Sequence, residues 1–592
     1  MFNNFIKLRQ ANFILLTLLY IFPIVLLIWF VAHYSFITPY WDQWRIVPMF
    51  AKMGEGNIDF ADLFSVHGHH RILFPKILMS ILAFATGWNT KYEMLCSILL
   101  TILSFWGLYQ IANNQRQPGD KYYFHTANIL AGLLLFSLVQ QQNWLWGFTL
   151  FWFGTNLSLI IGLYLLHGNP KIQPNQRLIL AAISCFIGSF TLAQGLFSWL
   201  VLIPSIFVLN NTPKIRLKNL LIWLSLFILC SWLYSIDYNP IRKPQPLFIL
   251  QQPLQVLQYF FGVLGLPFVR LPIPAVIIGL ILFTIFLGLA FYFLRKINWQ
   301  ITKLNLITPA IPWLALGLFS LIACLSITAG RAQYGLENVI SSTRYTTASI
   351  LLMIAIVYLG KLFFNRHEQA INSKFSQLIY QGLAIILTIV ILINSYYVIQ
   401  ATERNLPYMK SRQTCLELIN YLDESAFLNK SPDSCLVLMN GKTWLVREGA
   451  NSLEKLGWRT SKKNVEFMKN PSEVYGYLDQ LSTNSPLTVN TSENITLTGW
   501  ATLPDFAEKP ATVFLSRDDQ TKFFANGYIT LDSPDLAKHF QSPLYRQARW
   551  RVTFSADSLP IGNYTIFAWV YHPGKNQFMR LRDQVSLIVT GN

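Results

Sequence analysis

The chain has 592 residues, of which 53% are hydrophobic and only 12% charged, and its mean hydropathy is +0.38. This composition excludes a water-soluble globular protein and indicates that a lipid bilayer is the solvent for much of the chain. The formal net charge is +18. In the first 400 residues, however, the basic residues lie mainly in short loops between apolar segments, as topology determinants do. We therefore expect membrane lipids, and no nucleic acid, as partners.

Apolar segments long enough to cross a membrane recur from residue 12 to residue 400. A helix rising 1.5 Å per residue needs about 20 residues to cross a hydrocarbon core of roughly 30 Å. We predict a polytopic α-helical membrane protein with about eleven transmembrane helices. These are expected near residues 12–33, 93–112, 124–140, 148–166, 178–193, 197–210, 219–236, 272–294, 306–327, 347–363 and 380–400. The segment 72–87 is short for a crossing, and we expect it to lie against the outer surface.

Basic loops predict the orientation of these helices, because lysine and arginine collect on the cytoplasmic side of membranes. The loops concerned contain Lys7 and Arg9, Arg116 and Lys121, Lys171 and Arg177, Lys214, Arg216 and Lys218, Arg295, Lys296 and Lys303, and Lys361, Arg366 and Lys374. An odd number of crossings then leaves the amino terminus in the cytoplasm and the carboxyl terminus outside. The expected location is the plasma or inner membrane, with a transmembrane domain at 1–400.

The first outer loop, residues 34–92, carries a candidate acid. Asp42 follows the first predicted span directly and lies between Trp41 and Trp44. A carboxylate close to the hydrocarbon boundary loses hydration unless a cation, a metal or a hydrogen-bond donor compensates it, so Asp42 is a candidate catalytic residue. The alternative is that this stretch is an ordinary aromatic belt at the membrane interface.

The same loop contains a cluster of three histidines and one arginine: His67, His69, His70 and Arg71. Imidazole and guanidinium groups can bind a phosphate, and imidazoles can also bind a divalent metal. The alternative is a solvated helix cap at the membrane surface. A zinc site is not expected, because no cysteine lies nearby and the spacing matches neither a zinc finger nor His-Glu-x-x-His.

Arginines also occur in a predicted outer loop near the end of the membrane domain. Arg331, Arg344 and Tyr345 lie in the loop 328–346, where the positive-inside rule disfavours arginine. An anion such as a lipid-linked phosphate is expected to compensate the two charges, since a guanidinium binds phosphate oxygens bidentately. The alternative is that they pair with Glu337 or reach lipid head groups.

A third outer segment, the turn 139–147, combines amide and indole side chains. It contains Gln142, Asn143 and Trp144. Amides suit the hydroxyl groups of a sugar, and an indole ring suits stacking on it. The same residues would equally make an interface belt. Both interpretations stay open at the level of the sequence.

This arrangement resembles the GT-C class of membrane glycosyltransferases, and in particular the aminoarabinose-transferase and protein O-mannosyltransferase groups. The resemblance covers roughly residues 10 to 400, with Asp42 early in an outer loop and His69, His70 and Arg71 before an amphipathic helix. It implies transfer of a sugar from a polyprenyl-phosphate donor to a glycan, lipid or protein acceptor at the outer face.

Position by position, Asp42 matches the acid that acts as base or holds a metal in the family. The histidines match the place of a His-Pro-Pro-Leu-like element, but the prolines are missing. No Asp-x-Asp or Asp-Glu pair accompanies Asp42, which leaves a divalent metal cofactor open. Two alternatives remain, a transporter or flippase for a lipid-linked or anionic substrate and a non-catalytic surface-assembly protein. No internal repeat of the transporter kind is evident.

The remaining chain is expected to be extracytoplasmic, with an α/β linker region at 401–484 and a β-sandwich at 485–592. The sandwich is predicted from segments that alternate with the period of half-buried strands, at 495–500, 512–515, 550–554 and 564–570. Asp518, Asp519 and Asp532 are expected to be turn residues. This domain would bind carbohydrate or a partner.

Of the six cysteines, Cys415 and Cys435 alone lie in the outer region. In an oxidising compartment they could form a disulfide, with a stabilising effect of roughly 3 kcal/mol from loop closure. We further expect Asp42, His69, His70, Arg331 and Arg344 to border one outward-facing cavity, with Asp42 within roughly 20 Å, two helix diameters, of an arginine.

Overall fold

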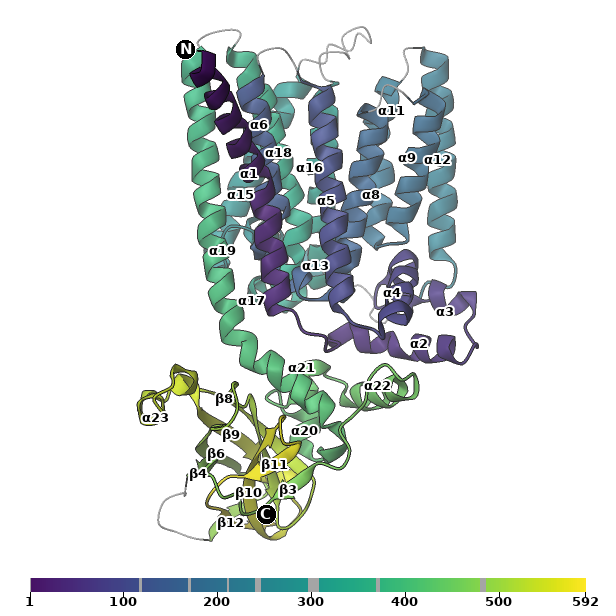
Figure 1. Cartoon of the computed structure of the whole chain (residues 1–592). Helices are drawn as coiled ribbons and strands as arrows, with labels where there is room; N and C mark the ends of the chain where they lie inside the picture. The colour runs from purple at the N-terminus through teal and green to yellow at the C-terminus, as the bar shows by residue number, and fades with distance from the viewer. Residues whose placement is uncertain are drawn as a thin grey trace. The chain divides into compact units, whose positions relative to one another are not determined.

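The computed structural model describes residues 2–116, 120–168, 172–209, 212–239, 246–295, 308–368, 373–479 and 486–591. Lys171, Lys296 and Lys303 of the predicted cytoplasmic loops lie outside these ranges. The chain folds into two compact units (Figure 1). The transmembrane unit comprises Met1–Ser35, Asp59–Leu82 and Lys91–Ala401, and the carboxyl-terminal unit comprises Phe36–Ile58, Ala83–Thr90 and Thr402–Asn592.

The transmembrane unit is a bundle of long helices that run side by side (Figure 1). Its helices are α1 (Phe2–Tyr34), α3 (Phe60–Phe64), α4 (Leu73–Thr86), α5 (Lys91–Asn114), α6 (Lys121–Leu135), α7 (Gln141–Trp144), α8 (Leu150–His167), α9 (Pro174–Ser189), α10 (Leu196–Val201), α11 (Ile203–Leu209), α12 (Pro213–Ser235), α13 (Pro246–Gln251), α14 (Pro253–Gly265), α15 (Pro272–Leu294), α16 (Ile311–Arg331), α17 (Leu336–Ser341), α18 (Thr346–Glu368) and α19 (Ser373–Glu417). The end of α4 and the part of α19 after Ala401 belong to the carboxyl-terminal unit.

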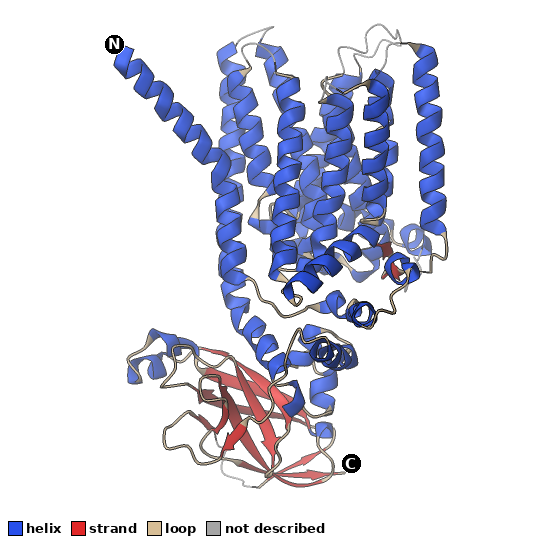
Figure 2. Ribbon diagram, turned by 45° about the vertical axis from the view of Figure 1, so that its right-hand side comes forward, coloured by secondary structure: helices blue, strands red, loops and turns tan. Residues whose placement is uncertain are grey.

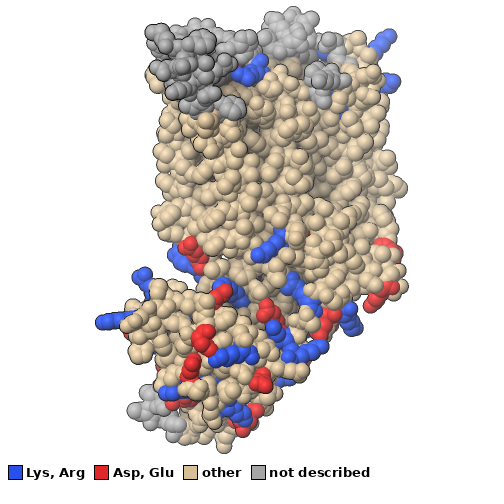
Figure 3. Space-filling view, viewed as in Figure 1, with Lys and Arg blue, Asp and Glu red and all other residues tan. Residues whose placement is uncertain are grey.

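Nine helices within the described ranges are long and apolar enough to cross a membrane. Between the two ends of the bundle, the face shown in Figure 3 carries hardly any charged side chain, as expected where lipid is the solvent. The chain is therefore an integral membrane protein. The other two predicted spans, 178–193 and 197–210, correspond to the shorter helix α9 and the apolar stretch Ala193–Leu209. The count of eleven crossings stays a prediction.

These two helices meet in a close backbone approach. The chain turns between α9 and α10 through η4 (Ala193–Gly195), and Gly195 packs directly on the backbone of Gly188. A Cβ atom at Gly195 would collide with the Gly188 carbonyl group.

The carboxyl-terminal unit combines helices with one hydrogen-bonded sheet of ten strands, shown in red in Figure 2. Its helices are α2 (Val47–Gly54), α20 (Ala426–Lys430), α21 (Cys435–Met439), α22 (Thr443–Lys455) and α23 (Pro534–His539). Its strands are β3 (Glu466–Met468), β4 (Gly476–Leu478), β5 (Leu487–Asn490), β6 (Asn494–Ala501), β7 (Thr512–Arg517), β8 (Phe523–Leu531), β9 (Arg549–Ser555), β10 (Gly562–His572), β11 (Gln577–Arg580) and β12 (Val585–Thr590).

The strand order is β3-β11-β10-β7-β8-β9-β6-β4, and β12 pairs with both β10 and β5. All pairs are antiparallel except β3 with β11 and β5 with β12. The predicted β-rich domain is thus present, and all ten strands belong to one hydrogen-bonded sheet, from which β12 and β5 branch off at β10. Two of the strands, β3 and β4, come from the region 401–484, the expected α/β linker region.

The segment before the sheet packs on strand β8, which is why this strand is buried on both faces. The Cys435 backbone N–H donates to Asn526 Oδ1 at 3.1 Å, and the Tyr528 hydroxyl donates to the Asp433 carbonyl at 2.6 Å. Cys415 and Cys435 form the disulfide that the sequence predicts, with Cα atoms 6.3 Å apart. The end of α19 is thereby joined covalently to α21.

Candidate functional site

The histidine cluster forms a tight hairpin in the transmembrane unit. Strands β1 (Val66–His67) and β2 (His70–Arg71) pair antiparallel, with Gly68 and His69 as the two-residue turn. Gly68 has a φ of +65°, which glycine adopts without steric cost and which such turns require. The His67 ring lies 5.0 Å from the Phe148 ring. The cluster is therefore an ordered hairpin before α4, not a helix cap.

Arg71 anchors this hairpin inside the protein. It is only 2% exposed. Its Nε donates to the Tyr234 carbonyl at 2.7 Å, its Nη1 donates to the Phe64 carbonyl at 2.6 Å, and its guanidinium lies 4.2 Å from the Phe64 ring centre. The Tyr238 hydroxyl donates to the His69 carbonyl at 2.9 Å. These contacts give Arg71 a structural role, and binding of substrate by it stays a prediction.

His70 lies near enough to Arg331, in the loop 328–346, to be influenced by its charge. Within the described residues its Nδ1 is buried and has no hydrogen-bond partner. Burial of the ring, followed by the influence of His69 and then of Arg331, lowers the pKa of His70 to about 4. The imidazole is therefore neutral at pH 7, with one nitrogen able to donate and the other able to accept.

Helix α14 holds the loop 328–346 in place. The Tyr259 hydroxyl donates to Asn338 Oδ1 at 3.0 Å, and Gln255 Nε2 donates to the Ala332 carbonyl at 2.9 Å. Burial, and to a lesser extent Tyr345, raises the pKa of Tyr259. The nearby charges of Arg331 and Arg344 partly offset this rise. A protonated phenol and two guanidinium groups thus share one neighbourhood.

Arg344 is positioned by the predicted amide cluster. Its backbone N–H donates to Gln142 Oε1 at 3.1 Å, and its carbonyl accepts from Asn143 Nδ2 at 2.8 Å. Asn143 Nδ2 also lies 2.6 Å from Thr347 Oγ1. The guanidinium of Arg344 donates through Nη2 to the Tyr345 hydroxyl at 3.3 Å. Residues about 200 positions apart in the sequence therefore fix the backbone on both sides of this arginine.

Trp144 lies inside the helix bundle. It is 0% exposed, its Nε1 donates to the Ser137 carbonyl at 2.9 Å, and its ring stacks on Phe153 at 4.3 Å. The indole therefore has its hydrogen-bond partner and its stacking partner within the protein. Sugar binding by Gln142, Asn143 and Trp144 stays a prediction.

Sequence reasoning missed three members of this neighbourhood, Arg270, Tyr259 and Asn338. Arg270 Nη2 lies 3.4 Å from the Val139 carbonyl, and burial lowers the pKa of its guanidinium. Arg270 lies in the predicted outer segment 237–271, where the positive-inside rule disfavours arginine as it does at Arg331 and Arg344. Tyr259 and Asn338 carried no signal, since nothing local shows that α14 packs on the loop.

The arrangement has an excess of positive charge. Within the described part of the chain, neither Arg331 nor Arg344 forms an ion pair with a carboxylate, Glu337 included. The guanidinium of Arg331 lies 5.9 Å from the Tyr334 ring centre. Two guanidinium forks with phenol and imidazole donors beside them suit the oxygens of a phosphate.

Asp42 belongs to the carboxyl-terminal unit, whereas the histidines and arginines belong to the transmembrane unit. It lies on the short helix η1 (Trp41–Arg45), 39% exposed, with Oδ1 3.4 Å from Arg45 Nε. Its convergence with the arginines in one cavity stays a prediction. No group of three or more His, Cys, Asp or Glu side chains is placed to hold a metal ion in the described ranges.

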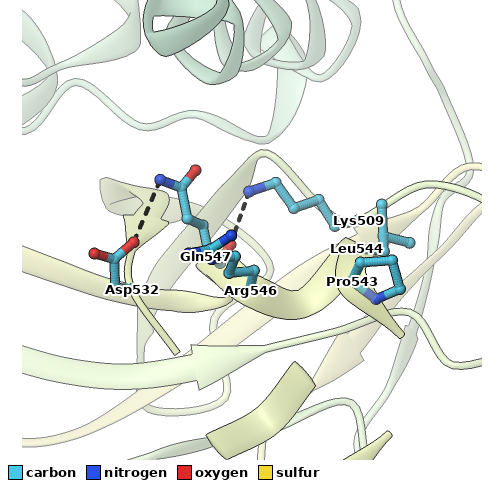
Figure 4. Close-up of a pocket in the computed structure, with 6 residues that line it drawn as sticks. All are labelled: Lys509, Asp532, Pro543, Leu544, Arg546 and Gln547. Carbon is cyan, nitrogen blue, oxygen red and sulfur yellow. Dashed lines mark hydrogen bonds between the residues drawn. The ribbon is translucent and has the colours of Figure 1, made fainter. Parts of the chain in front are cut away.

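A cavity of about 380 Å³ lies in the carboxyl-terminal unit (Figure 4). Lys509 Nζ donates to the Gln547 carbonyl at 2.7 Å, and Gln547 Nε2 lies 3.5 Å from Asp532 Oδ1. Lys509 and Asp532 are thus engaged within the protein. Asp518 also has a turn role, since its Oδ1 accepts from the Thr565 N–H at 2.9 Å.

A scan against protein-family models and a search of curated proteins find no match for this chain. A search of solved structures finds chains that are similar to this one. One is ArnT from Cupriavidus metallidurans bound to undecaprenyl phosphate, with a TM-score of 0.33 and 12% identity over 77% of each chain. Another is the Archaeoglobus fulgidus oligosaccharyltransferase in the apo form, with a TM-score of 0.37 and 11% identity over 78% of this chain and 62% of that chain. Both the TM-scores and the identities are low, so these likenesses carry no functional argument.

Proposed function

We propose that the protein is a membrane glycosyltransferase that takes a sugar from a polyprenyl-phosphate donor and passes it to an acceptor at the outer face of the membrane. The observation that carries the proposal is the pair Arg331 and Arg344, which lack a carboxylate partner among the described residues. Both lie near the protonated Tyr259, and Arg331 also lies near the neutral His70.

The position of these groups in the fold supports a lipid-linked anion. Arg331 ends α16 and Arg344 precedes α18, and both helices are long and apolar enough to cross a membrane. A phosphate on a polyprenyl chain lies at this depth, with its hydrocarbon in the bilayer and its oxygens at the helix ends. Each guanidinium can bind two of those oxygens. The donor sugar would then extend away from the hydrocarbon.

In this proposal Asp42 is the base that removes the proton from the acceptor hydroxyl as the hydroxyl oxygen attacks the anomeric carbon. The bond from that carbon to the phosphate oxygen breaks, and the polyprenyl phosphate leaves as an anion. Arg331 and Arg344 stabilise the negative charge that develops on the leaving phosphate.

The test measures transfer of label from a radiolabelled polyprenyl-phosphate sugar pool into acceptor, in membranes that contain equal amounts of each variant. Losing one charge-assisted contact of about 1.5–3 kcal/mol should lower kcat/KM for the donor by roughly 10- to 150-fold in Arg331→Ala and Arg344→Ala. Asp42→Asn should lower kcat by roughly 10²- to 10⁴-fold, because the amide cannot accept the proton.

Lys218→Ala is the matched control, because Lys218 is an exposed cation on α12 in a predicted cytoplasmic loop. It should transfer at the wild-type rate. Full transfer by both arginine variants would refute phosphate binding at this site. A wild type that transfers no sugar but moves the lipid-linked substrate between leaflets would establish the flippase alternative instead.

A further inference from the structure

The segment that carries Asp42 packs on a helix near the other end of the chain. Trp44, Val47 and Phe50 are each 0% exposed, and their spacing of three residues puts them on one face of η1 and α2. This face lies against α22, whose buried residues Val446, Gly449, Ala450 and Leu453 recur at helical spacing. All these elements belong to the carboxyl-terminal unit.

Gly449 is the closest point of this packing. A Cβ atom built on Gly449 would lie 2.7 Å from Trp44 Cε3 and 3.0 Å from Cζ3, closer than side chains approach in folded proteins. The indole therefore occupies the space that any other residue at position 449 would need. The Phe50 ring also packs against two further rings, with centres 5.5 Å from that of Trp458 and 5.1 Å from that of Trp88.

A hydrogen bond fixes the peptide immediately before Asp42. Asn440 Nδ2 donates to the Trp41 carbonyl at 2.7 Å, and Asn440 Oδ1 accepts from the Lys442 N–H at 2.8 Å. The peptide that joins Trp41 to Asp42 is planar, so a fixed Trp41 carbonyl fixes the direction of the Asp42 backbone N–H as well. Asn440 thus links the acid to the turn that leads into α22.

The backbone at Trp41 shows that this conformation is imposed by its surroundings. Trp41 has a φ of +48°, a region that bulky residues rarely occupy and that costs about 1–3 kcal/mol. Such a conformation persists only where other contacts determine it. Next to it, the Arg412 guanidinium lies 4.5 Å from the Tyr40 ring centre, so α19 also contacts this turn.

We propose that the carboxyl-terminal unit positions the acid, with Asn440 and Gly449 as positioning residues for Asp42. The inference rests on the proposed function, because it assumes that Asp42 is the base. The inference adds that the residues after 402 are needed for catalysis, because they contact residues 41–50.

The test compares Gly449→Ala with Gly441→Ala. A Cβ atom at Gly441 meets nothing within 4 Å, whereas one at Gly449 collides with Trp44. Alanine at position 449 also favours the helix by about 1 kcal/mol relative to glycine. A lower kcat in Gly449→Ala therefore cannot come from a weaker helix propensity. Asn440→Ala and Asn440→Asp form a second pair, because aspartate keeps the acceptor for the Lys442 N–H and loses the donor to Trp41.

Two quantities are measured on the full-length protein: the hydrogen exchange of the amides of residues 41–54, and kcat and KM for transfer. We expect faster exchange and a kcat lower by roughly 10- to 100-fold in Gly449→Ala and in both Asn440 variants, because misplacement by about 1 Å costs this much. KM for the donor should stay unchanged. In the Asp42→Asn background the Asn440 variants should cause no further loss.

Unchanged exchange in the Gly449→Ala and Asn440 variants would overturn the proposed contact. Faster exchange with an unchanged kcat would overturn the positioning role while leaving the proposed function intact. A wild type that transfers no sugar overturns the proposed function itself. An equal loss caused by Asn440→Ala with and without Asp42 would show that Asn440 acts on stability alone, and would also overturn the inference.

Discussion

The ion pair between Asp120 and Lys361 allows a quantitative test of the helix bundle. Lys361 Nζ lies 2.7 Å from Asp120 Oδ2, and the two side chains are 3% and 2% exposed. Asp120 precedes α6, and Lys361 lies on α18. Removing one partner of such a buried pair typically costs about 3–5 kcal/mol, because the other charge is left without compensation.

For Asp120→Asn we expect the lower end of that range. The Lys361 ammonium keeps the Phe124 ring, whose centre lies 5.3 Å away, and a cation–π contact of this kind contributes about 1 kcal/mol. The expected loss is therefore roughly 3 kcal/mol. In Asp120→Asn combined with Lys361→Met neither charge of the buried pair remains. The free energy of unfolding of the double variant should therefore lie within about 1 kcal/mol of the wild-type value.

The assay is a double-mutant cycle on purified protein in detergent, with the free energy of unfolding measured by denaturant titration. The two single variants should each be less stable than the double variant. If the free energy of unfolding of each single variant lay within about 0.5 kcal/mol of the wild-type value, water would reach the ion pair and the reasoning would be refuted.

Two further predictions concern stability. Cys435→Ser should lower the free energy of unfolding by roughly 3 kcal/mol, because the disulfide to Cys415 closes a loop of 20 residues; the same shift should follow reduction of the wild type but not of the variant. His70, whose pKa of about 4 lies below the reference of 6.5, stabilises the fold above pH 6.5 and loses that contribution as the pH falls toward 4. Between pH 7 and pH 5 the wild type should lose roughly 2 kcal/mol that His70→Gln does not lose, and equal losses in both would contradict the burial of His70.

The sequence predicts well those features that depend on local composition. The helix α15 has the predicted bounds of 272–294, because a run of apolar residues between two polar loops determines where a span begins and ends. The disulfide was also predictable, since Cys415 and Cys435 alone lie outside the apolar segments. Arg331 and Arg344 were singled out because arginine is unusual in a loop that is predicted to lie on the outer side of the membrane.

Features that depend on contacts between distant segments were not predictable. The strands β3 and β4 have three residues each, too few for an alternating pattern to appear. For the amides of Gln142 and Asn143 both a sugar site and an interface belt were open, and only the structure shows that both contact the backbone of Arg344. The polarity of a residue indicates that it needs partners but does not indicate which partners it finds.

The packing of residues 41–54 on α22 sets an order for biosynthesis. Trp41 and Asn440 are 399 positions apart. At about 5–20 residues per second, a ribosome needs roughly 20–80 s to synthesise the chain between them. During that interval the apolar face of Trp44, Val47 and Phe50 has no α22 to cover it. A newly made chain would then need protection of this face against aggregation until α22 has been synthesised.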